Sequence, residues 1–220
     1  LACSALGLFS GSMVAYFGVP PFVATLGMMM VGSGLAYMLS GGLSIYQLPQ
    51  SFDWLGRGDD LGGVPNAVVL MVVLYLLAHT LMSRTTLGRY IYAVGGNSEA
   101  ARLSGVPVKK ILLGVYASCG ALAGLGGVIM ASQFKSGDPK YGLMYELYVI
   151  AAVVVGGTSL SGGRGKVFGT LIGAFIIAVI QNGMNLTGVQ SYTQKVVLGV
   201  VLLAAVLLDM LKKRGWKLSL

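Results

Sequence analysis

Residues 66–82 read Asn66-Ala-Val-Val-Leu-Met-Val-Val-Leu-Tyr-Leu-Leu-Ala-His-Thr-Leu-Met82 and contain no charged side chain. Directly after this run the chain turns polar, and residues 83–110 carry a single acid, Glu99, and five basic side chains. A membrane-spanning helix needs about 20 mostly apolar residues, and basic residues gather in cytoplasmic loops. The junction therefore predicts a span that ends in a cytoplasmic loop. The basic residues are Arg84, Arg89, Arg102, Lys109 and Lys110.

The composition of the whole chain also indicates a membrane protein. Of its 220 residues, 55% are hydrophobic and 10% are charged, whereas soluble domains carry about 25% charged residues. The 34 glycines follow no collagen period and are typical of closely packed membrane helices. The net charge of +8 comes from basic residues between apolar segments, without an aromatic-interleaved patch, so nucleic-acid binding is not expected.

Apolar runs of suitable length predict an all-α fold, a polytopic transmembrane helix bundle with about seven membrane segments in a single domain over 1–220. The fifth segment is short and ends in Gly156-Gly157. It is either a short span or a half-helix, because broken helices occur at membrane depth only where protein or a cavity surrounds them. The segments are about 1–17, 22–39, 66–82, 111–132, 144–159, 167–184 and 196–211.

The basic residues predict the orientation of these segments. Alternating sides place eleven of the 15 Lys and Arg residues on one side, in 83–110, in 160–166 and in the tail with Lys212, Lys213, Arg214 and Lys217. The other side receives Arg57, Lys135, Lys140 and Lys195. The basic side faces the cytoplasm. Leu1 then lies outside, so an odd number of spans is expected before it if the protein's N-terminus is inside.

Residues 97–105 read Asn97-Ser-Glu99-Ala100-Ala101-Arg102-Leu-Ser-Gly105 and predict a short cytoplasmic helix. Asn97 or Ser98 can cap its start, and an acid in the first turn suits the helix dipole. Glycine then ends the helix, and Pro107 prevents its continuation. Small alanines would let this helix enter a groove of another protein. The spacing alone fits equally an ordinary loop helix without a partner.

A glycine-rich run over 154–166 superficially resembles a phosphate-binding loop. Leu160 stands where that motif needs glycine, and Val167 follows Lys166 instead of Ser or Thr. We interpret the run as a tight cytoplasmic turn. Two small-residue spacings, Gly120-x-x-x-Gly124 and Gly169-x-x-x-Gly173, predict helix–helix contacts, within the bundle or across a dimer.

The sequence offers no set of residues for covalent chemistry. His79 is the only histidine, and a lone histidine supports neither catalysis nor metal binding. Cys3 and Cys119 lie inside apolar runs, which suits neither a disulfide nor a metal site. We therefore expect a protein that is not an enzyme, with no catalytic, cofactor-binding or metal-binding residues.

Several runs together resemble the permease subunit of ribose-type monosaccharide ABC importers. The resemblance covers essentially the whole chain and is specific to the family but not to the sugar. Tyr148 departs from it where an acid is usual, Ser33 where an arginine is common, and Leu198 where a lysine is frequent. The runs that carry it are 21–27, 88–106, 150–163, 169–174 and 182–192.

The resemblance implies a permease of roughly ten spans that works as a homodimer in the bacterial inner membrane. Its partners would be cytoplasmic ABC ATPase subunits, which hold the ATP and magnesium, and an extracytoplasmic sugar-binding protein. This chain would lack about three N-terminal spans and hold no cofactor of its own. The loop 83–110 would be the coupling loop to the ATPase. Its matching residues are Asn97, Glu99, Ala100, Ala101, Arg102 and Gly105.

We therefore expect the membrane-spanning subunit of an ATP-driven importer of a pentose or hexose. Small and hydroxyl residues of the broken fifth segment, Gly156, Gly157, Thr158 and Ser159, are expected to line the translocation path. The alternative is a self-contained secondary transporter or channel, which would need ion-coupling carboxylates at mid-membrane. None is evident in the sequence.

Overall fold

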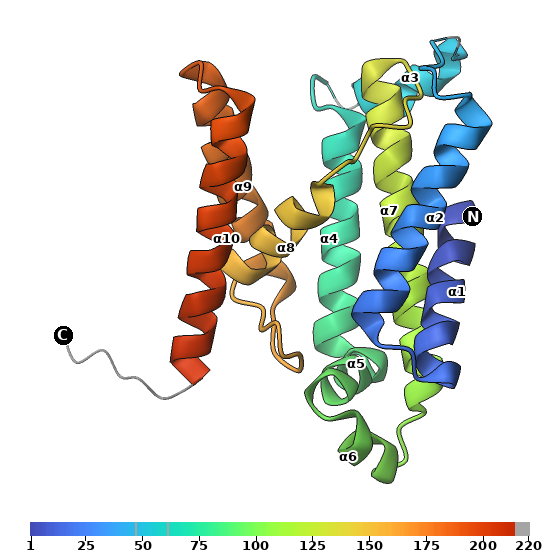
Figure 1. Ribbon diagram of the computed structural model, residues 1–220, viewed down its shortest axis with the longest axis vertical. Coiled ribbons are helices and arrows are strands. Elements are labelled where there is room, and N and C mark those ends of the chain that lie inside the picture. Colours follow the sequence, from blue (N-terminus) through green and yellow to red (C-terminus); the bar gives the residue numbers. More distant parts are fainter. Residues whose placement is uncertain (47, 61, 214–220) are drawn as a thin grey trace, which may run out of the picture. The chain divides into compact units, whose positions relative to one another are not determined.

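The computed structural model describes residues 1–46, 48–60 and 62–213, and its regular elements there are helices, as the sequence predicts (Figure 1). An isolated bridge pairs Ile45 with Gly137. Arg214 and Lys217 of the predicted basic tail lie outside the described residues. The helices are α1 (Ala2–Phe17), α2 (Pro21–Ser40), η1 (Gln50–Phe52), α3 (Asp53–Arg57), α4 (Asn66–Arg84), α5 (Thr86–Gly96), α6 (Ser98–Leu103), α7 (Val108–Phe134), α8 (Tyr145–Val155), α9 (Val167–Leu186) and α10 (Ser191–Lys213).

Five of these helices are long and apolar enough to cross a membrane, namely α2, α4, α7, α9 and α10. The apolar helices α1 and α8 are shorter, with 16 and 11 residues. At about 1.5 Å per residue, α8 rises only about 16 Å, roughly half of a hydrocarbon core about 30 Å thick. Its length therefore fits the half-helix interpretation of the fifth segment.

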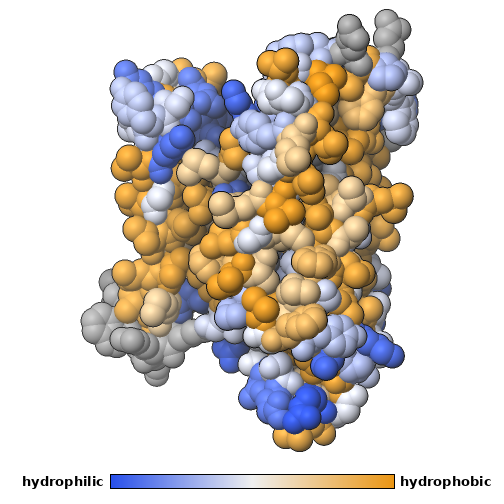
Figure 2. All heavy atoms as spheres, turned by 45° about the vertical axis from the view of Figure 1, so that its right-hand side comes forward, coloured by the Kyte–Doolittle hydropathy of each residue, from blue (hydrophilic) through white to orange (hydrophobic). Residues whose placement is uncertain are grey.

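Large apolar side chains are exposed along these helices, as lipid contact requires. On the face drawn in Figure 2 they cover the middle of the helices, and hydrophilic side chains gather around the helix ends. Phe22, Met30 and Met38 of α2, for example, are 73%, 73% and 80% exposed. In water such a surface would be unfavourable, whereas hydrocarbon tails solvate it.

The described residues form two compact units. The first unit comprises Leu1–Leu74 and Glu99–Gly142, and the second comprises Tyr75–Ser98 and Leu143–Leu220. The boundaries cut through α4 and between Ser98 and Glu99. The second boundary therefore lies inside the basic loop, residues 83–110.

In the first unit, α1 and α7 pack closely along their lengths. A Cβ on Gly7 would collide with the Tyr116 carbonyl oxygen, and one on Gly120 with the Cys3 carbonyl oxygen. At Gly124 a Cβ would lie 2.9 Å from that of Cys3. The pair Gly120 and Gly124 thus makes a contact within the bundle, one of the two alternatives for this spacing.

The short helix α3 is fixed to the non-basic end of α7 by one buried hydroxyl. Ser132 is fully buried; its Oγ accepts a hydrogen bond from the Gly56 amide at 2.8 Å and donates one to the Phe52 carbonyl at 2.6 Å. Glycine is required at position 56, because a Cβ there would lie 2.7 Å from the Gln133 amide nitrogen. The helix α3 is therefore held in place by a residue far away in sequence.

Polar contacts near α3 also join the segments before α4 to the residues that follow α7. Lys135 forms an ion pair with Asp53, and the Ser44 hydroxyl donates to Asp138 Oδ2 at 2.6 Å. The hydrogen bond from Ser44, followed by the Lys140 amide, holds the pKa of the Asp138 carboxyl below its usual value. The carboxylate therefore remains charged under mildly acidic conditions, and its contribution is lost only when pH falls through that lowered pKa.

In the second unit, α8 lies against α9 and α10 around a core of Ala151, Ala152 and Ile177. The contact with α9 is made by backbone. A Cβ on Gly169 would collide with the Gly156 carbonyl oxygen, and one on Gly173 with the Ala152 carbonyl oxygen. The second predicted small-residue spacing is thus also a contact within the bundle.

We predict that Ser132→Ala loosens α3 without unfolding the helices. The Gly56 amide would lose its partner, and a buried unsatisfied group costs about 1–3 kcal/mol. Hydrogen–deuterium exchange of the Gly56 amide in the full-length protein should then accelerate about 5- to 150-fold. Ser12→Ala is the control, because the Ser12 hydroxyl is exposed and bonds only within its own helix. Unchanged exchange at Gly56 in Ser132→Ala would contradict the proposed anchoring.

Candidate functional site

The basic loop contains two helices, of which sequence reasoning expected only one. The additional helix, α5, begins after Thr85, whose side chain accepts a hydrogen bond from the Gly88 amide at 3.2 Å. Its signal was a Thr cap followed by apolar residues at helical spacing, Leu87, Ile91 and Val94. The sequence analysis placed these residues in the cytoplasmic loop without a helix.

The expected helix is present as α6, and its end follows the predicted chemistry. Gly105 adopts φ +81°, in the left-handed region that favours glycine. The Gly105 amide donates to the Arg102 carbonyl, and the Val106 amide donates to the Ala101 carbonyl, each at 3.0 Å. This bond pair is the Schellman arrangement that closes a helix. The loop conformation is thereby set by backbone bonds.

The side chains of α6 divide into an exposed and an enclosed set. Glu99 and Arg102 are exposed and form an ion pair three residues apart; the Arg102 hydrogen bond and charge lower the pKa of the Glu99 carboxyl. Leu103 is 77% exposed, whereas Ala101 is only 5% exposed. Among the predicted coupling residues, Ala101 therefore shapes the loop from inside, while Glu99, Ala100 and Arg102 lie at its surface.

The predicted path residues lie in a turn between α8 and α9, which we call the glycine turn, residues 156–166. Gly157 has φ +84° and is exposed, whereas Ser159 is only 8% exposed. The Thr158 amide donates to the Val153 carbonyl, and the Ser159 amide donates to the Arg164 carbonyl at 3.0 Å. Hydrogen bonds within the turn and to α8 therefore determine its shape.

An acid that sequence reasoning did not single out is bonded to this turn. The Ser159 hydroxyl donates to Asp209 Oδ2 of α10 at 3.4 Å. Asp209 lies near the basic end of α10, within the apolar run 196–211. An acid inside an apolar run was the available signal, because such residues are costly in a membrane and usually have a polar partner.

The glycine turn also contacts α5, within the second unit. The Tyr92 hydroxyl donates to the Gly165 carbonyl at 2.9 Å. Next to this bond, Gly95 and Gly96 at the end of α5 lie directly against Gly162 and Gly163 of the turn. The basic loop and the glycine-rich run, which are far apart in the sequence, are thus in direct contact.

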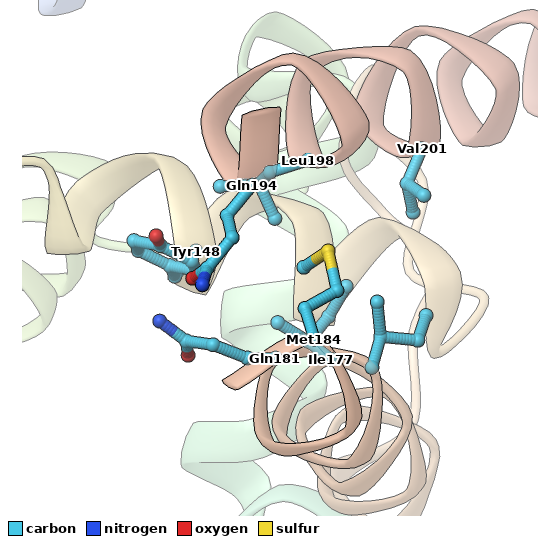
Figure 3. Close-up of a pocket in the computed structure, with 8 residues that line it drawn as sticks. Tyr148, Ile177, Gln181, Met184, Gln194, Leu198 and Val201 are labelled. Carbon is cyan, nitrogen blue, oxygen red and sulfur yellow. The ribbon is translucent and has the colours of Figure 1, made fainter. Parts of the chain in front are cut away.

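A pocket lies between α8, α9 and α10 toward their non-basic ends (Figure 3). Figure 3 shows the polar ends of Tyr148, Gln181 and Gln194 gathered at one side of it. The Gln194 amide donates to Asn185 Oδ1 at 2.9 Å and to the Val189 carbonyl at 2.8 Å. Within the part of the chain that the structure describes, the Tyr148 hydroxyl and the Gln181 amide make no hydrogen bond. The remaining lining is apolar: Ile177, Ile180, Met184, Leu198 and Val201.

The pocket and the glycine turn present hydroxyl and amide groups. Among the described residues, no three His, Cys, Asp or Glu side chains come together as a metal site. Free Cys3 and Cys119 remain unpaired with each other. What the structure supplies is hydroxyl and amide groups in an apolar setting, and loops joined by backbone contacts.

The long apolar helices define a multi-pass membrane protein. A family model described as "Branched-chain amino acid transport system / permease component" matches residues 1–206. The chain belongs to this family of transport permeases, and the sequence-based identification of a permease is confirmed. No solved structure matches the chain.

Relatives in the family include several sugar permeases. The ribose import permease protein RbsC of Escherichia coli (strain K12) is 46% identical over 94% of this chain and 65% of its own length. The Bacillus subtilis (strain 168) ribose import permease is 44% identical, covering 91% of this chain and 62% of the relative. The L-arabinose transport system permease protein AraH of Escherichia coli (strain K12) is 38% identical over 94% of this chain and 62% of its own length. This chain thus spans a little under two thirds of these relatives.

We predict that the basic loop and the loop around α3 lie on opposite membrane faces. In a full-length protein with Cys3 and Cys119 replaced by alanine, Leu103→Cys should react with a membrane-impermeant maleimide only after the membrane is opened. Tyr46→Cys should react in intact cells. The two positions are matched, since Leu103 is 77% and Tyr46 is 75% exposed. Labelling of Leu103→Cys in intact cells would reverse the orientation.

Proposed function

We propose that this chain is the membrane-spanning part of a permease subunit of an ATP-driven importer that moves a monosaccharide, a pentose or hexose, across the bacterial inner membrane. The observation that carries the proposal is identity of 46% to a ribose import permease over 94% of the chain. Relatives named for D-allose and L-arabinose are 39% and 38% identical. Ribose, D-allose and L-arabinose are all monosaccharides, which supports this substrate class.

The proposed assembly contains two permease copies, ABC ATPase subunits on the basic side and a sugar-binding protein on the opposite side. ATP and magnesium belong to the ATPase subunits, and this chain holds no cofactor. Excess positive charge on one side supports the assignment of that side to the cytoplasm. The permease contributes two arrangements of its helices, whose populations shift with the state of its partners.

The ATPase contact is proposed to involve α6 and its flanking residues in the basic loop. Its surface combines an exposed ion pair, Glu99 and Arg102, with the apolar Leu103. A short helix with charged and apolar exposed side chains can enter a groove and be oriented there by charge. Ala101 and Gly105 serve this contact by determining the shape of the loop, and Asn97 joins α5 to α6.

The sugar path is proposed to pass the half-helix α8 and the glycine turn. Gly156, Gly157, Thr158 and Ser159 would line it toward the cytoplasm, where exposed backbone at Gly157 offers polar groups. The pocket that contains Tyr148 lies toward the other end of the same helices. The Tyr148 hydroxyl and the Gln181 amide, which have no hydrogen-bond partner among the described residues, suit the hydroxyls of a sugar, since each can both donate and accept.

We expect the full-length permease, reconstituted with its ATPase subunits and binding protein, to accumulate labelled monosaccharide only with ATP. Ribose, allose and arabinose should be compared, each at the same concentration. The control is the same vesicle with a non-hydrolysable ATP analogue. Uptake driven by a proton or sodium gradient without the ATPase would support the secondary transporter and reject this proposal.

We also expect Glu99→Lys to weaken attachment of the ATPase subunits. The change reverses the charge at the start of α6, where the helix dipole favours an acid, and it breaks the pair with Arg102. The dissociation constant of the complex should rise about two- to fivefold, measured by titrating the ATPase onto the purified permease. The matched control is Asp59→Lys, a charge reversal of an exposed acid in the loop near α3. Equal constants for both variants would exclude Glu99 from the contact.

A further inference from the structure

The contact between α5 and the glycine turn is built almost entirely of backbone. A Cβ on Gly163 would lie 2.7 Å from Gly96 Cα, and one on Gly95 would lie 3.0 Å from the Gly163 amide nitrogen. At Gly162 a Cβ would collide with the Gly95 carbonyl oxygen. At these glycines backbone meets backbone, so no rotamer change of theirs can absorb a displacement. When α5 moves, the turn therefore has to move with it.

A second attachment point lies beside the first. Tyr92 stands one helical turn before Gly96 on α5, and its hydroxyl donates to the Gly165 carbonyl at 2.9 Å. Two separated points of attachment resist rotation of the turn about either one. The contact can therefore transmit a tilt of α5 as well as a translation.

The far side of the glycine turn is attached to the helices that carry the proposed sugar path. The turn begins at the end of α8, where Gly156 lies against Gly169 of α9. The Ser159 hydroxyl bonds to Asp209 of α10. A displacement that reaches the turn from α5 is thus passed to α8, α9 and α10.

We propose that the contact of Tyr92, Gly95 and Gly96 with residues 162–165 transmits the motion of the coupling loop to α8 and the sugar path. These are positioning residues, which touch neither nucleotide nor sugar. The inference rests on the proposed function, because it assumes that ATPase subunits move the basic loop. It goes further by naming the contact through which that movement reaches the path.

The experiment measures sugar taken up per ATP hydrolysed by the reconstituted full-length complex. Gly162→Ala should separate α5 from the turn while α6 keeps its conformation. We expect attachment of the ATPase subunits to be unchanged and uptake per ATP to fall about fivefold or more, the size of typical couplings between sites. Tyr92→Phe removes only the hydroxyl, so a fall of about two- to tenfold is expected.

Gly188→Ala is the matched control for backbone strain. Gly188 has φ +70°, close to the φ +81° of Gly162, but no atom would lie within 4 Å of its Cβ. Both substitutions therefore strain a left-handed turn, and only Gly162→Ala also pushes on a neighbour. Uptake per ATP in Gly188→Ala should remain within about twofold of wild type, as for a surface change without a contact.

The possible outcomes separate this inference from the proposed function. Without ATP-dependent uptake by the wild type, the proposed function itself fails. If the wild type transports and Gly162→Ala keeps the same ratio, the contact transmits nothing and the inference alone is wrong. Loss of ATPase attachment in Gly162→Ala would also overturn the inference, since the contact between α5 and the glycine turn would then be needed to bind the ATPase subunits. Should Gly162→Ala fail to reach the membrane, the ratio measured for Tyr92→Phe decides.

Discussion

The fold depends on the inability of hydrocarbon to hydrogen-bond to a polypeptide backbone. Each unpaired amide or carbonyl in the bilayer costs several kcal/mol, so the chain crosses it as helices and confines irregular backbone to protected places. The end of α8 is one such place. There the Gly156 amide bonds to the Ala152 carbonyl and the Thr158 amide to the Val153 carbonyl. At the same point Gly156 packs closely against Gly169 of α9.

Segments outside the long helices are held by different means in the two units. In the first unit, α3 is held by side chains: the buried Ser132 hydroxyl and the ion pair of Lys135 with Asp53. In the second unit, α5 and the glycine turn meet mostly through backbone. A side chain can exchange one partner for another, whereas backbone in direct contact has little freedom to slide. Side-chain contacts therefore allow a segment to shift, whereas direct backbone contact makes a rigid connection.

Sequence reasoning identified what local chemistry determines. The run 66–82 became α4, and α6 ended at Gly105 as its glycine and the following proline predicted. The fold class and the permease identification followed from apolar length and from motifs that extend along the chain. Orientation, ATPase contact and sugar path remain predictions.

What sequence reasoning missed depends on residues far apart in the chain. The five-residue helix α3 has no strong signal of its own, because Ser132 on α7 completes its hydrogen bonds. Asp209 gained a role only when the fold brought Ser159 beside it. Similarly, Gly95 and Gly162 each looked like abundant glycine in a glycine-rich protein. Their pairing is a property of the second unit and of neither local pattern.

The construction of α6 separates its shape from its surface. Its end is fixed by amide-to-carbonyl bonds around Gly105, while the exposed side chains of Glu99, Arg102 and Leu103 are no part of those backbone bonds. If α6 binds the ATPase subunits as proposed, substitutions at the projecting positions can therefore change which ATPase is recognised and leave the helix end intact. Related transporters in one cell would then diverge in partner choice through a few surface exchanges.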